Sequence, residues 1–202
     1  MRRLLVPLAI VIALAGCSTN ASSSQPSEPS EPPKPAPTVQ FNKALHDELV
    51  GMLKRDQDER SGGPAGEGDR ARTDRLKEII EQYGWPTIDL VGKDGEDAAW
   101  AIAQHSDFDP AFQQKALELL RDAVANGRAS PGNLAYLEDR VAVANGQPQV
   151  YGTQIRCSPD GPVPVTPIKD EAGVEERRKA AGLDTLADYL AEMAAICAQD
   201  AG

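Results

Sequence analysis

The chain has 202 residues, a formal net charge of −10 and an aromatic content of 4%. This length allows one domain, or one domain with appendages. The acidic balance argues against a nucleic-acid-binding protein, which needs clustered lysine and arginine to displace counterions. It argues equally against electrostatic docking on anionic lipid.

The N-terminal segment has the pattern of a signal peptide. Two arginines precede an apolar run, residues 4–15, that is shorter than the ~20 helical residues needed to cross a bilayer. The run ends in the letters LAGC, which resemble a bacterial lipobox whose cysteine is Cys17. In lipoproteins of that type, cleavage leaves the acylated cysteine as the first residue. We therefore predict a lipoprotein signal peptide over residues 1–16 and a palmitate-bearing Cys17, which anchors the protein to the extracytoplasmic face of the cell membrane.

The segment after Cys17 is rich in Ser, Pro and Glu and has almost no large apolar side chains. Such a composition cannot bury enough surface to offset the entropy lost on ordering. We predict a disordered tether over residues 17–40 and a folded domain over residues 41–202.

From residue 41 onward, apolar residues recur mostly at helical spacing. Thr73 is a candidate N-cap, and Asp109-Pro110 and Ser130-Pro131 each combine an N-cap with proline at the first helical position. The predicted helices cover about residues 41–60, 74–83, 96–105, 110–127, 131–146, 171–181 and 185–198.

The spacing of apolar residues changes after Gly146. The segments QVYGTQIRC and VPVTPI flank SPDGP, which has turn chemistry, and together they predict a β-hairpin near residues 148–168. Tyr151 and Thr153 would share one face of its first strand. The predicted fold is mainly α with one β-hairpin (α+β), a compact helical domain of six or seven helices.

The cysteines left after lipidation are Cys157 and Cys197. In an exported protein they suggest one disulfide, closing a loop of about 40 residues, although two separate buried thiols are the alternative. No Cys/His spacing indicates a zinc site. We expect no cofactor and no bound metal.

The stretch AWAIAQHSDFDPAFQ contains His105, one of two histidines in the chain. The favoured interpretation is that this stretch is a joint between two helices. His105 would lie at the end of the first helix, and Asp109 would cap the second. Asp107 has no such local role, so the sequence leaves open the alternative that His105 is a general base oriented by a neighbouring carboxylate. A metal site is a further alternative, with calcium or magnesium fitting the oxygen ligands better than zinc.

Other polar residues lie among apolar positions. Asp56 and Arg60 are spaced for an i,i+4 pair, which is worth little if it is on the surface. Asp139 and its neighbour Arg140 suggest a surface or buried ion pair. Arg178 and the residue before it are expected mainly on a solvated face.

Several segments together resemble a known family. MLKRDQDER, GWPTIDLVG, AAWAIAQHSDFDPAFQ, LAYLEDRVAVANGQPQVYGTQ and PIKDEAGVEERRKAAGL are similar, in this order, to an uncharacterised bacterial family, domain of unknown function 6624. The resemblance covers roughly residues 44–189 and implies no activity. Its recurring polar positions correspond here to Gln149 and to a candidate pocket formed by Asp56, Arg60, His105, Asp107, Asp109, Gln113, Asp139, Arg140, Tyr151 and Gln154.

Three classes of function remain. The first is a tethered lipoprotein that binds an unidentified protein or small molecule. The second is a hydrolase or other acid–base enzyme, with His105 as base, Asp107 or Asp109 as its orienting group, Arg60 or Arg140 as anion holder, and water as nucleophile. The third is a structural envelope protein without a concave site.

The enzyme hypothesis predicts how its residues are arranged in space. It requires one solvent-reachable pocket lined by Asp56, His105, Asp139, Arg140 and Tyr151. The sequence does not assign the catalytic residues.

Overall fold

The computed structural model describes residues 39–64 and 66–200. The predicted signal peptide, the predicted lipidation site at Cys17 and nearly all of the predicted tether lie outside these residues. Within them the chain forms seven α-helices, one short 3₁₀ turn and one antiparallel hairpin. This confirms the predicted fold class.

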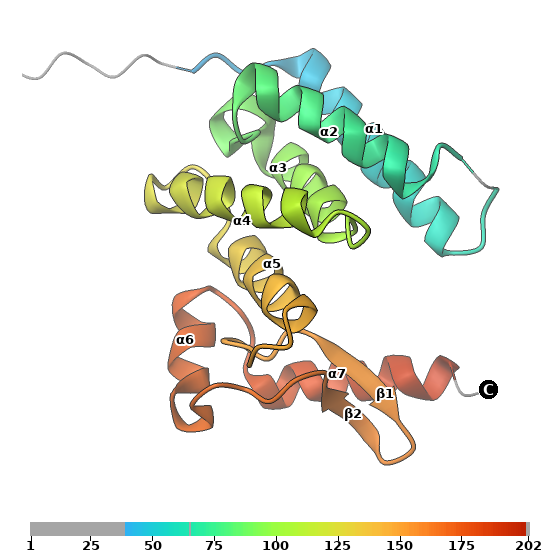
Figure 1. Ribbon diagram of the computed structural model, residues 1–202, viewed down its shortest axis with the longest axis vertical. Helices are drawn as coiled ribbons and strands as arrows, with labels where there is room; N and C mark the ends of the chain where they lie inside the picture. The colour runs from blue at the N-terminus through green and yellow to red at the C-terminus, as the bar shows by residue number, and fades with distance from the viewer. Residues whose placement is uncertain (1–38, 65, 201–202) are drawn as a thin grey trace, which may run out of the picture. The chain divides into compact units, whose positions relative to one another are not determined.

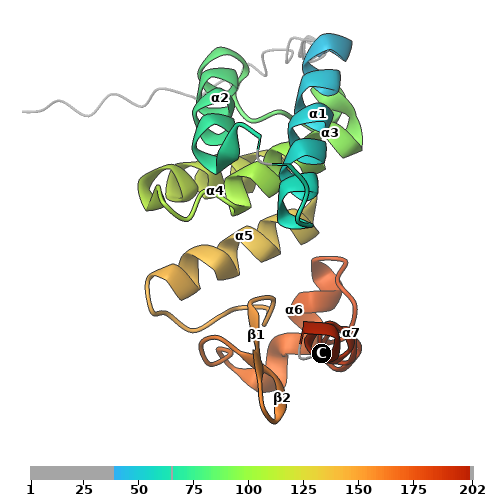
Figure 2. The same cartoon turned by 90° about the vertical axis from the view of Figure 1, so that its right-hand side faces the viewer.

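Helix α5 lies between helices α1–α4 and the C-terminal elements, as two perpendicular views show (Figures 1 and 2). The helices are α1 (Lys43–Arg60), α2 (Gly68–Tyr83), α3 (Ile88–Gln104), α4 (Pro110–Ala125), α5 (Pro131–Ala144), α6 (Val174–Ala180) and α7 (Leu186–Asp200). The strands are β1 (Ile155–Ser158) and β2 (Gly161–Pro164), and η1 (Glu171–Gly173) is the 3₁₀ turn.

The first five helices share one apolar core. Leu49, Leu76 and Leu120 are completely buried in it, and each such side chain contributes about 1.5–3 kcal/mol through its removal from water. Helix α3 packs mainly on α1. Its contribution to the core includes the alanines Ala98 and Ala99, whose small side chains let neighbouring helices approach closely.

The helix boundaries follow from local chemistry at the predicted caps. The Asp109 side chain accepts a hydrogen bond from the Phe112 N–H (3.0 Å), and the Ser130 hydroxyl accepts one from the Asn133 N–H (3.3 Å). Each of these caps is followed by proline at the start of its helix. Gly84 ends α2 with a φ of 73°, a conformation that glycine adopts without strain.

Two predicted helix starts were wrong. Helix α2 begins at Gly68, so Thr73 lies inside it, where its hydroxyl is buried and 2.8 Å from the Ser106 hydroxyl. Helix α3 begins at Ile88 instead of near residue 96 and is interrupted at Gly92, whose φ of 75° breaks the helical path. Neither start has a local cap, because the side chains of Glu67 and Thr87 make no capping hydrogen bond.

The predicted first strand is shorter than expected. Residues 149–154 form an irregular loop instead of a strand, and regular pairing with β2 starts only at Ile155. Gly152 has a φ of 70°, which no strand residue adopts, and a Cβ at this position would lie 2.6 Å from Ile168. Tyr151 and Thr153 therefore do not share a strand face.

Polar side chains and a covalent bond hold the C-terminal elements together. A disulfide joins Cys157 of β1 to Cys197 of α7, with Cα atoms 5.5 Å apart. Arg178, expected on a solvated face, is 1% exposed. It donates hydrogen bonds to the carbonyl oxygens of Asp184 (2.7 Å) and Tyr151 (2.9 Å), so burial satisfies its guanidinium through backbone acceptors that the sequence pattern does not reveal.

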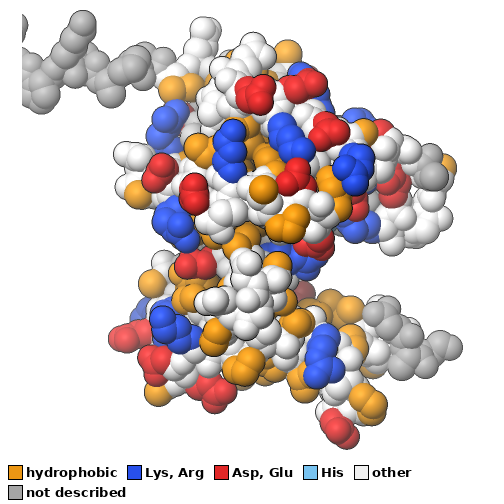
Figure 3. Space-filling model, viewed as in Figure 1, with side chains coloured by type: hydrophobic (Ala, Val, Ile, Leu, Met, Phe, Trp, Pro, Cys, Tyr) orange, Lys and Arg blue, Asp and Glu red, His pale blue; other side chains and the backbone are white. Residues whose placement is uncertain are grey.

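The surface of the domain carries both signs of charge. Figure 3 shows acidic and basic side chains interspersed over the face formed by the helices at the N-terminal end of the domain. In the part of the chain that the structure describes, no helix combines the length and the apolar character needed to cross a bilayer.

Candidate functional site

The turn between α3 and α4 sends the side chains of its polar residues to different neighbours. His105 follows the last residue of α3 and faces Asp56 of α1. Asp107 pairs with Arg140 of α5. Asp109 caps α4 and also pairs with Lys77 of α2 at 2.8 Å, and this interaction lowers the pKa of Asp109. The turn therefore contacts three other helices, α1, α2 and α5, through three separate interactions.

Asp56 is a completely buried carboxylate with basic partners on three sides. Arg60 donates its Nε–H to both Asp56 oxygens at 3.2 and 3.1 Å. The His105 Nδ1 lies 3.1 Å from Oδ1, and a guanidinium nitrogen of Arg72 lies 3.5 Å from the same oxygen. The predicted i,i+4 pair thus exists, but within a buried network, where removing one partner of a pair costs about 3–5 kcal/mol.

Arg72 extends this network to two more carboxylates. Its side chain is 2% exposed and donates to Glu59 at 2.9 and 3.0 Å and to Asp69 at 2.8 Å. Arg60 also reaches Asp69 at 2.8 Å. Three carboxylates therefore face two arginines and one histidine, and each carboxylate is already paired with an arginine.

The protonation of Asp56 and His105 follows from this setting. Burial alone would raise the pKa of Asp56, but the Arg60 hydrogen bond and the charges of His105 and Arg60 outweigh it and hold the pKa below its usual value. Burial lowers the pKa of His105, and the attraction of Asp56 offsets this only in part. His105 is therefore neutral at pH 7. We assign its Nδ1 proton toward the carboxylate, which is the stronger acceptor.

Asp107 connects the turn to the C-terminal elements. It accepts hydrogen bonds from Gln113 Nε2 (3.0 Å) and Arg140 Nε (2.9 Å), and a second Arg140 nitrogen contacts its other oxygen. Arg140 also donates to Gln154 Oε1 at 3.1 Å. Burial would raise the pKa of Asp107, but the hydrogen bonds from Arg140 and Gln113 outweigh it and lower the pKa. Asp107 is therefore ionised and paired.

Asp139 is not available to a ligand, because its carboxylate accepts hydrogen bonds from the loop over residues 149–154. Its Oδ1 accepts the N–H groups of Val150 (2.6 Å) and Tyr151 (3.1 Å). Its Oδ2 accepts both the N–H (2.9 Å) and the hydroxyl (3.0 Å) of Thr153. Asp139 does not form the expected ion pair with Arg140, since backbone N–H groups take up its carboxylate.

The structure thus distributes the predicted site residues among separate clusters. Asp107, Arg140 and Gln154 line one groove of about 330 Å³ with Val143 and Val165. Asp56 and His105 belong to the arginine network on α1 and α2, while Asp139 and Tyr151 belong to the loop before β1. The single pocket that the enzyme hypothesis demands is not assembled from these groups.

The metal alternative has no assembled ligand set in residues 39–64 and 66–200. No group of three histidine, cysteine, aspartate or glutamate side chains is arranged there to hold an ion. The carboxylates beside His105 diverge, because Asp107 turns to α5 and Asp109 turns to its own helix cap.

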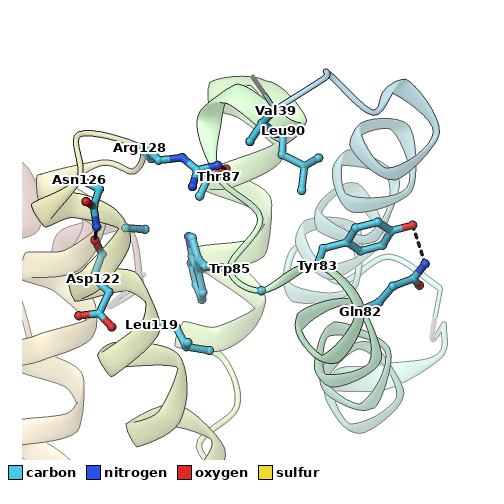
Figure 4. A pocket seen from close by; sticks show the side chains of 12 residues that line it. Val39, Gln82, Tyr83, Trp85, Thr87, Leu90, Leu119, Asp122, Asn126 and Arg128 are labelled. Atoms are coloured by element: carbon cyan, nitrogen blue, oxygen red, sulfur yellow. Dashed lines mark hydrogen bonds between the residues drawn. The ribbon is translucent and has the colours of Figure 1, made fainter. Parts of the chain in front are cut away.

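A groove of about 490 Å³, which the sequence did not predict, lies between the C-terminal ends of α2 and α4 and is named the Trp85 groove below. Figure 4 shows Trp85 at its centre, with Asp122 and Asn126 of α4 on one side and Tyr83 of α2 on the other. Residues 82–85, 87, 90, 119, 122, 123, 126 and 128 line it together with Val39. The sequence signal was the GWP turn, which predicts a buried tryptophan but not the groove above it.

Behind this groove lies a buried carboxylate that the sequence did not single out. Glu96 is completely buried and accepts hydrogen bonds from Trp85 Nε1 (3.4 Å) and Asn133 Nδ2 (2.9 Å). Burial raises the pKa of Glu96 to about 7, and the charge of Asp97 adds to the rise. Among the described residues no arginine or lysine pairs with Glu96 to offset this burial, in contrast to Asp56.

Residues 64–198 match a family described as "Family of unknown function (DUF6624)". The match leaves out α1, and with it Asp56 and Arg60, but it reaches further toward the C-terminus than the resemblance seen in the sequence. No curated protein and no solved structure matches the chain. Because the match covers more than half of the chain, the protein belongs to this family of unknown function.

Proposed function

We propose that this protein is a lipid-anchored binding domain, held on the extracytoplasmic face of a bacterial membrane by Cys17 and a tether. The LAGC letters at the end of a short apolar run support the anchor. The structure is compatible with this arrangement, because the folded domain starts after the tether, with α1 at Lys43.

The disulfide supports the extracytoplasmic face. Cys157 and Cys197 are bonded across β1 and α7, and structural disulfides persist in oxidising compartments and are rare in the cytosol. A cytosolic location would leave this pair reduced. The bond therefore agrees with the export that the predicted signal peptide implies.

One observation carries the choice of binding over catalysis. The candidate acid–base groups are engaged with one another or with the backbone, whereas the Trp85 groove combines the exposed side chain of Tyr83 with polar groups and stays open. Its volume of about 490 Å³ lies within the range of ligand sites in proteins. A binding role needs such a concave surface, and a purely structural envelope role does not.

Metabolic labelling tests the anchor. The full chain is expressed in a bacterium that processes lipoproteins, in the presence of radiolabelled palmitate. We expect label on the wild-type protein in the membrane fraction and none on Cys17→Ala, because an amide-linked and sulfur-linked acyl anchor needs the cysteine. Cys197→Ser is the matched control, since it also removes a cysteine but should keep the label, because Cys197 belongs to the disulfide and not to the anchor.

Protease added to intact spheroplasts tests whether the domain lies on the extracytoplasmic face of the membrane. The domain should be digested while a cytosolic marker survives. Wild-type protein without label, or recovery of the chain only in the soluble fraction, would overturn the proposal.

A further inference from the structure

His46, the other histidine of the chain, lies between two carboxylates. It belongs to the first turn of α1, and its Nδ1 lies 3.0 Å from Oδ1 of the neighbouring Asp47. Its Nε2 lies 3.0 Å from Oδ2 of Asp94, which belongs to α3 and follows the break of that helix at Gly92. The ring therefore connects the start of α1 to the break in α3.

This arrangement selects the protonated form of the ring. A neutral imidazole has one N–H donor and one nitrogen that accepts, so it could donate to only one of the two carboxylates. Its other nitrogen would present a lone pair to a carboxylate oxygen 3.0 Å away. The imidazolium form donates from both nitrogens, and its positive charge faces two negative ones. The two-sided contact is therefore complete only when His46 carries the additional proton.

The charged groups around the ring agree with this assignment. The hydrogen bond to Asp94 and then that to Asp47 raise the pKa of His46 above its ordinary value. Lys43 of α1 is paired with Asp47 at 2.5 Å, and Lys93 of α3 is paired with a carboxylate one turn further along at 2.6 Å. The two aspartates are therefore the charges that act on the ring.

The first described residues of the chain lie against the start of α3. The Asn42 N–H donates to the Leu90 carbonyl oxygen at 2.7 Å, and the Phe41 ring packs on the His46 ring with centroids 5.6 Å apart. Val39 and Leu90 both line the Trp85 groove, and Figure 4 shows them on the same side of it. His46 is thus the charged contact beside a segment that forms part of the groove wall.

We propose that His46 is a pH-dependent latch, which in its protonated form holds residues 39–42 on α3 and keeps this wall of the Trp85 groove in place. Loss of the proton removes one of its two hydrogen bonds, so the segment is held more weakly as the pH rises. The latch would regulate the groove, and in that respect it rests on the proposed binding function. Its chemistry depends only on the contacts of the ring.

Nuclear magnetic resonance of the two histidine rings measures the proton directly. The full processed chain, labelled with ¹⁵N in detergent micelles, is titrated from about pH 5 to about pH 9. We expect His46 to titrate above the usual value of ~6.5, and His105 to titrate below it, because burial lowers the pKa of His105.

Two aspartate variants locate the origin of this difference. Asp94→Asn removes one of the two carboxylates, so His46 should bind its proton about threefold more weakly. Asp58→Asn is the matched control, since this carboxylate of α1 is paired with Lys54 and lies outside the cluster. It should leave the titration of His46 unchanged.

Hydrogen–deuterium exchange measures the latch itself. After correction for the intrinsic exchange rate, which rises with pH, residues 39–46 should exchange about threefold faster at pH 8 than at pH 6. The sign follows from the raised pKa of His46, because the contribution of such a group is present below its ordinary pKa and is lost as the pH rises through the raised one. In His46→Gln the corrected rate should be the same at both pH values, because an amide does not titrate. Asp58→Asn should keep the pH dependence of the wild type.

Three results would overturn the inference: a His46 titration at or below the usual value, a titration that Asp94→Asn leaves unchanged, or equal corrected exchange of residues 39–46 at pH 6 and pH 8 in the wild type. None of these measurements requires a ligand or the acyl chains. They are therefore distinguishable from failure of the proposed function, which palmitate labelling of Cys17 tests.

Discussion

Helices α1–α5 and the C-terminal region, residues 147–200, are stabilised in different ways. The first region buries an extended apolar core. In the second, the completely or nearly buried apolar residues among those described are Ile168, Val174 and Ala181. There, side chains bind backbone groups instead. The difference teaches that one region is specified by hydrophobic periodicity and the other by individual polar side chains.

The loop over residues 149–154 shows the second mode most clearly. Asp139 accepts three of its N–H groups, while Arg177 and Arg178 donate to two of its carbonyl oxygens at 2.8 and 2.9 Å. The Tyr189 hydroxyl donates to a third, that of Thr153, at 2.8 Å. Side chains from three helices thus replace the hydrogen bonds that a sheet would provide.

Asp139→Ala should give the largest loss of stability in the molecule. It leaves three backbone N–H groups without their acceptor, including that of the buried Thr153, and we expect a loss of about 4 kcal/mol. Chemical denaturation followed by circular dichroism measures it. Asp139→Asn keeps one carbonyl oxygen as acceptor and should cost less than half as much. Equal losses for the two variants would show that the charge, rather than hydrogen bonding, matters.

Leu120→Ala tests the apolar side of the comparison. Leu120 is completely buried, so we expect a loss of about 3 kcal/mol from lost burial and the cavity left behind. Val174→Ala, a smaller truncation in the C-terminal region, should cost about 1 kcal/mol. If the valine substitution destabilises the protein as much as the leucine substitution does, the contrast between the two regions is wrong.

The same contrast explains how much of the fold the sequence could predict. The caps at Asp109 and Ser130 and the break at Gly84 are local, because each depends on residues within one turn of the helix end. The paths of residues 149–154 and the burial of Arg178 are not local. Their partners are backbone groups far along the chain. Because almost every residue has the same backbone N–H and C=O groups, the sequence does not show which of them is the partner.

Opening the disulfide should affect the C-terminal region alone. Cys197→Ser releases α7 from β1, and we expect a loss of about 2 kcal/mol, low in the usual range because α7 is mostly exposed. Hydrogen–deuterium exchange should speed up over residues 155–164 and 186–200 and stay unchanged in α1–α4. Faster exchange in α1–α4 as well would mean that the two regions unfold together.

The sequence marked polar residues that the structure buries or pairs, but it did not predict how they are grouped. Polar residues such as Asp56, Asp107 and Asp139 stood out because they interrupt apolar patterns, and the structure does bury or pair them. Which partners they take depends on how helices cross, as with Arg72, which joins the Asp56 network from another helix. The Trp85 groove arises between helix ends, where no motif marks it.

Glu96→Gln should have a small effect on stability that depends on pH. The pKa of Glu96 is raised to about 7 in the folded protein, whereas the side chain of an unfolded chain loses this proton near pH ~4.3. Folded protein therefore binds more protons than unfolded protein between these values, so stability falls as the pH rises through that window. A neutral amide at this position would carry no such penalty. We expect the variant to be more stable than wild type at pH 8 by roughly 1–2 kcal/mol and no more stable at pH 4.

Asp56→Asn is the matched comparison, because Asp56 is equally buried but surrounded by arginines. The lowered pKa of Asp56 means that its contribution to stability is present above its usual pKa and is lost only as the pH falls through the acid range. The variant should therefore be less stable than wild type at pH 8, the opposite sign to Glu96→Gln. Thermal unfolding at pH 4 and pH 8 decides this. The same sign for both would mean that burial, and not the charge of the neighbours, governs how this fold tolerates a carboxylate inside it.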